Sequence, residues 1–159
     1  MPIFETSFQV NAPLDVVTAF HHDTRTLRLL TPPPVYVQLH RVDPLAEGSI
    51  SIFTMWFGPI PIRWKAVHSQ VDPRSGFTDT QAEGPLLRWT HRHTWKSLDD
   101  KTTLMTEHID YQHHPGLKGW LTRILFSTTG LKAMFFYRKL ATQHGVKRLL
   151  QSPEYNRKP

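Results

Sequence analysis

The sequence predicts an α+β fold, in which a curved antiparallel sheet packs one face against a long amphipathic helix. Short strand-like segments fill the chain between residues 35 and 112. The gaps between them are short and rich in Gly, Pro and Asp, which favours hairpins between antiparallel neighbours. A helical pattern of apolar residues then begins at Leu117.

The N-terminal elements follow from local signals. Alternating apolar and polar residues at 3–10 predict the first strand. The Asn-Ala-Pro run at 11–13 favours the start of a helix that ends near His22, because Asn suits the cap and Pro the first turn. Asp23 can cap a second short helix. The three prolines at 32–34 end it, because proline removes a backbone donor.

Six further strands are then expected, at residues 35–43, 49–57, 62–72, 76–83, 86–97 and 102–112. The C-terminal helix should show a kink or a short break at 127–130 and fray after Gly145. We expect one domain over residues 1–150 and a flexible tail over 151–159.

Composition excludes several classes of site. The chain has 159 residues and no cysteine, so disulfide frameworks, thiolate zinc sites and cysteine nucleophiles are ruled out. Neither an apolar run of membrane-spanning length nor a signal-peptide pattern is visible. We therefore expect a soluble, cytoplasmic protein.

The net charge of +6 is concentrated in the last third of the chain. Residues 1–111 carry 10 Lys and Arg against 12 Asp and Glu, whereas residues 112–159 carry nine basic residues and one acidic residue. A solvated helix face explains this pattern, and contact with an anionic membrane surface is an alternative. Nucleic acid is not an expected partner, since no stacking aromatics are interleaved with the basic residues.

The segment with the most informative candidate functional residues runs from Phe77 to Trp95, FTDTQAEGPLLRWTHRHTW. Alternate residues of a strand share a face, so two tryptophans and two histidines should point the same way. These four residues are Trp89, His91, His93 and Trp95.

This face has several possible roles. The histidines can be hydrogen-bonded packing groups, or they can line a ligand pocket beside the tryptophans. His-x-His on a strand also suits zinc, but the sequence shows no third ligand, and we expect neither a metal site nor a cofactor. Acid–base catalysis by His91 or His93 overlaps with the pocket interpretation.

Arg138 continues the apolar stripe of the C-terminal helix, from Leu131 and Phe135, and should face the sheet. A buried arginine needs a partner. We favour an internal ion pair with Asp79 or Asp110, and an anionic ligand group is the alternative.

The run Phe-x-Asp-x-Gln-x-x-Gly-Pro-x-x-x-Trp-x-His-x-His-x-Trp resembles the signature of bacterial SRPBCC proteins, the START-like superfamily of polyketide cyclase/dehydrase and lipid-transport proteins. Weaker similarities are Ala12-Pro13, Leu30-Thr31-Pro32-Pro33 and Phe136-Tyr137-Arg138. The resemblance covers roughly residues 3–145. It implies a helix-grip fold, in which seven antiparallel strands wrap around the C-terminal helix and leave a cavity for lipids, sterols or polyketides. It supplies no complete catalytic set.

The expected function is therefore binding of a hydrophobic or amphipathic small molecule in that cavity, without assigned catalysis. The alternatives are a polyketide cyclase- or dehydratase-like enzyme that uses a cavity histidine as general base, and a membrane-surface docking module. Candidate catalytic residues are His91, His93, Tyr111 and Arg138. Candidate ligand-binding residues are Trp56, Trp64, Trp89, His91, His93, Trp95, Met105 and Tyr111 from the strands, with Trp120, Ile124, Leu131, Met134 and Phe135 from a helical lid.

Overall fold

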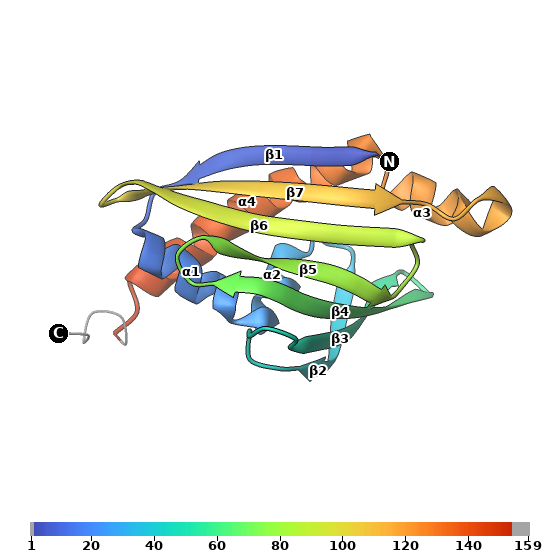
Figure 1. Cartoon of the computed structure of the whole chain (residues 1–159), viewed down its shortest axis with the longest axis horizontal. Coiled ribbons are helices and arrows are strands. Elements are labelled where there is room, and N and C mark those ends of the chain that lie inside the picture. The colour runs from blue at the N-terminus through green and yellow to red at the C-terminus, as the bar shows by residue number, and fades with distance from the viewer. Residues whose placement is uncertain (1, 154–159) are drawn as a thin grey trace.

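A seven-stranded antiparallel sheet curves around the helices, which confirms the predicted α+β fold (Figure 1). The computed structural model describes residues 2–153. The strand order is β1-β7-β6-β5-β4-β3-β2. The strands are β1 (Ile3–Val10), β2 (Tyr36–Val42), β3 (Ile50–Phe57), β4 (Ile60–Asp72), β5 (Gly76–Glu83), β6 (Arg88–Asp99) and β7 (Thr102–Gln112).

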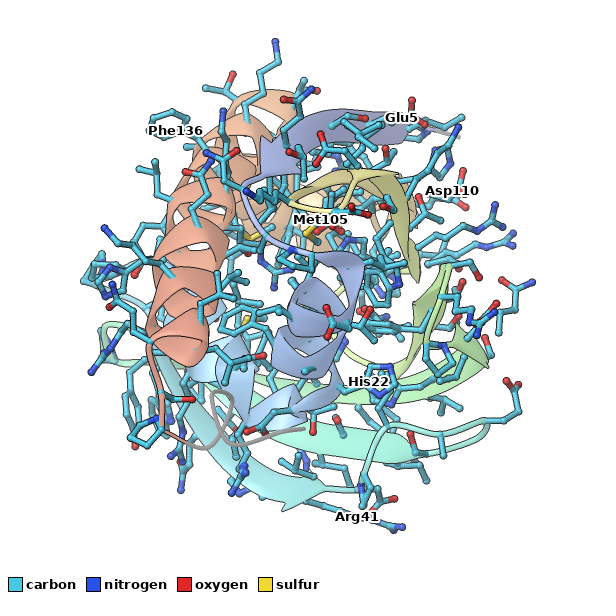
Figure 2. The ribbon with its side chains drawn as sticks, turned by 90° about the vertical axis from the view of Figure 1, so that its left-hand side faces the viewer. Glu5, His22, Arg41, Met105, Asp110 and Phe136 are labelled. Atoms are coloured by element: carbon cyan, nitrogen blue, oxygen red, sulfur yellow. The ribbon has the colours of Figure 1, made fainter. Side chains whose placement is uncertain are left out.

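The helices form two groups. Between β1 and β2 lie α1 (Leu14–His22), the short 3-10 helix η1 (Thr24–Thr26) and α2 (Leu27–Leu30). After β7 come the 3-10 helix η2 (Gly116–Gly119), α3 (Trp120–Leu125) and α4 (Thr128–Leu150). Figure 2 shows α4 facing the sheet, with Met105 between them and Phe136 pointing away. None of the described helices is both long and apolar enough to cross a membrane, and the cytoplasmic location stays a prediction.

The C-terminal helical pattern is divided in two, close to the predicted break. Phe126 follows the last residue of α3, and the side chain of Ser127 caps α4 by accepting a hydrogen bond from the backbone N–H of Gly130 at 3.0 Å. α4 continues to Leu150, so the expected fraying after Gly145 is wrong. The predicted tail at 151–159 lies mostly outside the described residues.

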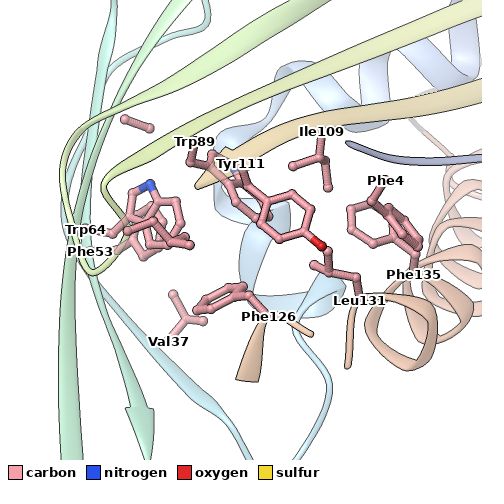
Figure 3. Close-up of a cluster of buried hydrophobic side chains, with 12 residues drawn as sticks. Phe4, Val37, Phe53, Trp64, Trp89, Ile109, Tyr111, Phe126, Leu131 and Phe135 are labelled. Carbon is pink, nitrogen blue, oxygen red and sulfur yellow. The ribbon is translucent and has the colours of Figure 1, made fainter. Parts of the chain in front are cut away.

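Two apolar clusters form the core. One contains Phe4, Trp64, Trp89 and Phe135 among others (Figure 3). The second is built around residues of α1, Trp95 and Met105. Since Trp89 and Trp95 lie on the same strand and belong to different clusters, the histidines between them lie where the two clusters meet.

Helices α1 and α4 approach closely at Gly145. A Cβ atom at this position would overlap the ring of Phe20, which is itself buried. The absence of a side chain at Gly145 therefore fixes how near α1 lies to α4.

We expect Gly145→Ala to lower the free energy of unfolding by about 1–3 kcal/mol, because overpacking outweighs the better helix propensity of alanine. Urea denaturation measures this change. Phe20→Leu should recover part of the loss in the double variant, and His144→Ala, at an exposed neighbouring position, is the control. A Gly145→Ala protein as stable as the wild type would show that the helices are not in tight contact here.

Candidate functional site

A cavity of about 410 Å³ lies between the concave face of the sheet and the helices. Strands β3 to β6 form one wall, the segment from η1 to the prolines after α2 forms another, and the junction of α3 and α4 closes the third. Apolar side chains dominate these walls, among them Leu27, Phe53, Met55, Phe57, Trp64 and Phe126. The polar lining includes His21, Ser51, His68, Asp79, His91, His93 and Arg138.

Strand alternation places the two histidines at the cavity, as expected. Trp89, His91, His93 and Trp95 are all buried, with 3–6% of each residue exposed. The intervening residues of β6 are exposed or half-buried. The sequence therefore predicted which face of β6 is turned inward.

Strand pairing builds a cluster of four polar side chains around these histidines. Asp79 of β5 is paired with His91, and Glu107 of β7 is paired with His93. The two imidazole rings lie 3.8 Å apart between their centroids. The ring of Phe77 stacks on His93 at 4.3 Å and holds it from the other side.

Each imidazole contacts both carboxylates. His91 Nε2–H donates to Glu107 Oε2 at 2.8 Å, and His91 Nδ1 lies 3.5 Å from Asp79 Oδ2. His93 Nε2–H donates to Asp79 Oδ2 at 2.9 Å. His93 Nδ1 lies 2.7 Å from Glu107 Oε2, as an ion pair rather than an aligned hydrogen bond.

One imidazolium and two carboxylates dominate the electrostatics of the cluster. Burial alone would lower the pKa of His93, but the charge of Glu107 and the hydrogen bond with Asp79 raise this pKa to about 9. Burial alone would raise the pKa of Asp79, but the nearby histidines lower it to about 2. The histidines likewise hold the pKa of Glu107 well below its usual range, against the effect of burial.

The pKa of the second histidine shifts the opposite way. Burial and the positive charge of His93 lower the pKa of His91. Because the ionised carboxylate of Glu107 can only accept, its hydrogen bond with His91 Nε2 places a ring proton on that nitrogen. The two histidines thus differ in the direction of their pKa shifts although they are alike in sequence context.

The favoured prediction of an ion pair between Arg138 and Asp79 or Asp110 is wrong. Asp110 points to the outer face of the sheet beside His108, with 3.3 Å between Asp110 Oδ2 and His108 Nε2 (Figure 2). Among the described residues, no carboxylate is close enough to Arg138 for a salt bridge. The guanidinium lies 5.2 Å from the centre of the Phe135 ring, its Nε is buried without a hydrogen-bond partner, and the side chain lines the cavity.

The cavity brings together five of the predicted ligand-binding residues: Trp64, Trp89, His91, His93 and Met134. Trp95, Met105, Tyr111, Leu131 and Phe135 are buried in the core and do not line it. Trp56 lies off the cavity lining, and its indole N–H donates to Gln38 Oε1 at 3.1 Å. The expected helical lid is only partly formed, because Trp120 and Ile124 of α3 are 57% and 60% exposed.

Sequence reasoning missed two buried groups. Glu107 shares strand parity with Met105 and Tyr111, which were inward candidates, so the alternation along β7 could have identified it. His21 lies near the end of a helix, where no sequence signal marks it as inward, yet it is buried and donates from Nδ1 to the carbonyl of Val17 at 2.8 Å. Burial lowers the pKa of His21 to about 4.

No protein-family model and no curated protein matches the chain. Several solved structures of other proteins do match it. The ZhuI aromatase/cyclase from Streptomyces sp. R1128 is 18% identical with a TM-score of 0.66, and the match covers 96% of this chain and 97% of that one. Major latex-like protein 151 from Panax ginseng is 13% identical with a TM-score of 0.66, over 90% and 95% of the two chains.

Norcoclaurine synthase from Thalictrum flavum is 18% identical with a TM-score of 0.65, over 90% of this chain and 87% of that one. Identities this low show the fold alone. The chain therefore has the helix-grip fold of START-like proteins, as the run from Phe77 to Trp95 suggested.

Proposed function

We propose that this protein binds a hydrophobic small molecule with one polar end in the cavity between sheet and helices. The observation that carries the proposal is the cavity itself, where aromatic and aliphatic walls meet a charged cluster. Ligand pockets combine these two features, because apolar area supplies affinity and a few placed polar groups supply orientation.

The aromatic part of the wall suits a flat or extended apolar ligand. Phe53 stacks on Trp64 with 6.1 Å between ring centroids, and Trp89 meets Trp64 edge to face at 5.5 Å. These contacts hold the rings in fixed orientations before any ligand binds. A rigid wall of this kind lowers the conformational entropy lost on binding.

Polar atoms without partners in the cavity support the proposal that the ligand has one polar end. The hydroxyl of Ser51 and Nε of Arg138 are both buried without a hydrogen-bond partner, and both residues line the cavity. Leaving such groups unpaired is unfavourable by about 1–3 kcal/mol each. A ligand oxygen that reaches them would remove this penalty, and an anionic group would also pair with Arg138.

One of the similar solved structures contains ligands of this kind. The Thalictrum norcoclaurine synthase was solved with dopamine and hydroxybenzaldehyde, which are small aromatic molecules with polar substituents. Acid–base catalysis by His91 or His93 stays a prediction for this chain. Three of the candidate catalytic residues, the two imidazoles and Arg138, face the cavity, whereas the fourth, Tyr111, lies outside the lining.

A second candidate function is docking on an anionic membrane, favoured by the surface of η2 and α3. Leu117, Trp120 and Ile124 are 87%, 57% and 60% exposed, and Lys118 lies among them. No Asp or Glu occurs between residues 112 and 153. α3 extends past the end of the sheet in Figure 1, and the residues that follow Ile124, Leu125 and Phe126, line the cavity. Docking there would place the cavity beside the lipid.

We expect Ala66→Phe to abolish binding of the neutral fluorescent probe N-phenyl-naphthylamine, because the ring would fill the cavity from β4. Fluorescence titration measures the affinity. Ala82→Phe, at an exposed position of β5, is the matched control. Ser51→Leu fills the cavity from β3 and serves as a second variant if Ala66→Phe unfolds. Unchanged binding in folded variants would place the probe outside the cavity.

We expect Arg138→Gln to weaken binding of anilinonaphthalene sulfonate about 10-fold, which corresponds to the loss of one charge-assisted contact. The uncharged N-phenyl-naphthylamine should bind equally well before and after the change. Lys132→Gln, on the exposed side of α4, controls for the loss of a positive charge. An equal effect of Arg138→Gln on both probes would contradict a specific role in pairing with an anion.

Flotation with vesicles containing phosphatidylglycerol tests the docking surface. The wild type should float at low salt and less so at high salt, because salt screens the attraction between basic residues and anionic lipid. Trp120→Ser with Ile124→Ser should reduce flotation severalfold, while Phe136→Ser, an exposed residue on α4, should not. Binding that is indifferent to anionic lipid would reject this function.

A further inference from the structure

We propose that Asp79, His91 and His93 form a binding site for a divalent transition-metal ion, with zinc as the best match. One ligand atom from each of the three residues lies within 4.8 Å of the others. Two imidazoles and one carboxylate are a donor set that zinc accepts readily. The inference goes beyond the proposed function, because the ion would be bound whether or not a hydrophobic ligand is present.

The spacing of the ligand atoms fits a metal ion. Asp79 Oδ2 lies 2.9 Å from His93 Nε2 and 3.5 Å from His91 Nδ1. Zinc bonds to nitrogen and oxygen at about 2.0–2.2 Å, so neighbouring ligands of a tetrahedral ion lie roughly 3.3 Å apart. The two separations from Asp79 bracket this value, and all three ligand atoms lie within 4.8 Å of one another. Side-chain adjustments that bring the three atoms to tetrahedral spacing would admit an ion.

Glu107 turns the required nitrogens toward Asp79. Its Oε2 lies 2.8 Å from His91 Nε2 and 2.7 Å from His93 Nδ1, so one carboxylate oxygen engages both rings on the side away from Asp79. Metal-bound histidines commonly donate their other ring N–H to a carboxylate, which fixes the tautomer and the ring orientation. Glu107 is 3% exposed and does not line the cavity, as expected of a positioning residue.

Two ring nitrogens face the same carboxylate oxygen. His91 Nδ1 and His93 Nε2 lie 3.5 Å and 2.9 Å from Asp79 Oδ2. In the structure the proton on His93 Nε2 is donated to this oxygen. A metal ion would take the place of that proton, which is released to solvent on binding, because histidine binds a metal only through a deprotonated ring nitrogen.

The cavity leaves room for a fourth ligand. Asp79, His91 and His93 all line it, so an ion held by three protein ligands would keep an open position toward the bound molecule. Open sites of this kind characterise catalytic rather than structural zinc. Asp79 and Glu107 together offset the charge of the ion, and the positive Arg138 on the same cavity favours an oxygen anion in the open position.

Zinc titration of the full chain, after treatment with a chelator, tests the proposal. We expect one zinc ion per chain. Asp79→Asn should weaken binding more than about 10-fold, because it removes a ligand, and Glu107→Gln should weaken it about 10–100-fold through the orientation of the rings. The control is His108→Gln. His108 also lies between two carboxylates, 2.8 Å from Glu5 and 3.3 Å from Asp110, but on the outer face.

Imidazole nitrogen NMR of the wild type gives a readout that does not require the variants to fold. On addition of zinc, His91 Nδ1 and His93 Nε2 should shift as metal ligands, while His91 Nε2 keeps its proton. Shifts confined to surface histidines, or affinity lost only in His108→Gln, would overturn the proposal. Absence of zinc binding to the wild type would overturn it as well, and leaves the hydrophobic probe measurements unaffected.

Discussion

The burial of Glu107 beneath two imidazoles is the interaction on which the rest of the site depends. An ionised carboxylate in a protein interior is strongly unfavourable unless positive charge and hydrogen bonds compensate for its lost hydration. Here His93 supplies the positive charge and His91 the aligned hydrogen bond. The pairing of β5, β6 and β7 brings these groups together, so a one-residue change in the register of β6 would turn both histidines to the outer face, away from the carboxylates.

The apolar clusters on either side make this arrangement rigid. Trp89 and Trp95 flank the histidines along β6 and pack into separate parts of the core. Phe77 stacks on His93, and Phe135 meets His91 edge to face at 5.4 Å. The imidazoles are therefore held by neighbouring aromatic rings as well as by the two carboxylates. A site that is oriented in this way before binding loses little free energy to reorganisation when a ligand or ion arrives.

Sequence patterns predicted most of the fold because strand alternation and turn residues are local signals. They located the seven strands to within a few residues and the inward face of β6. They failed where the outcome depends on which segments meet in space. Arg138 was correctly placed facing the sheet, but the folded chain leaves Asp79 and Glu107 beyond salt-bridge distance, where their charges raise the pKa of Arg138 against the effect of burial. Trp120 and Ile124 have helical spacing that suits a lid, yet α3 lies beyond the edge of the sheet and leaves them exposed.

The separate cap on α4 has a consequence for the wall of the cavity. Ser127 starts α4 independently of α3, so the capping hydrogen bond of this 23-residue helix does not depend on the six residues of α3. Phe126, at the junction, contacts Trp64 and Trp89 and closes that part of the wall. This part of the wall therefore depends on one aromatic ring at a helix junction, whereas the buried charges are held by strand pairing. A substitution at the junction can change the shape of the cavity without changing the cluster that faces the polar end of a ligand.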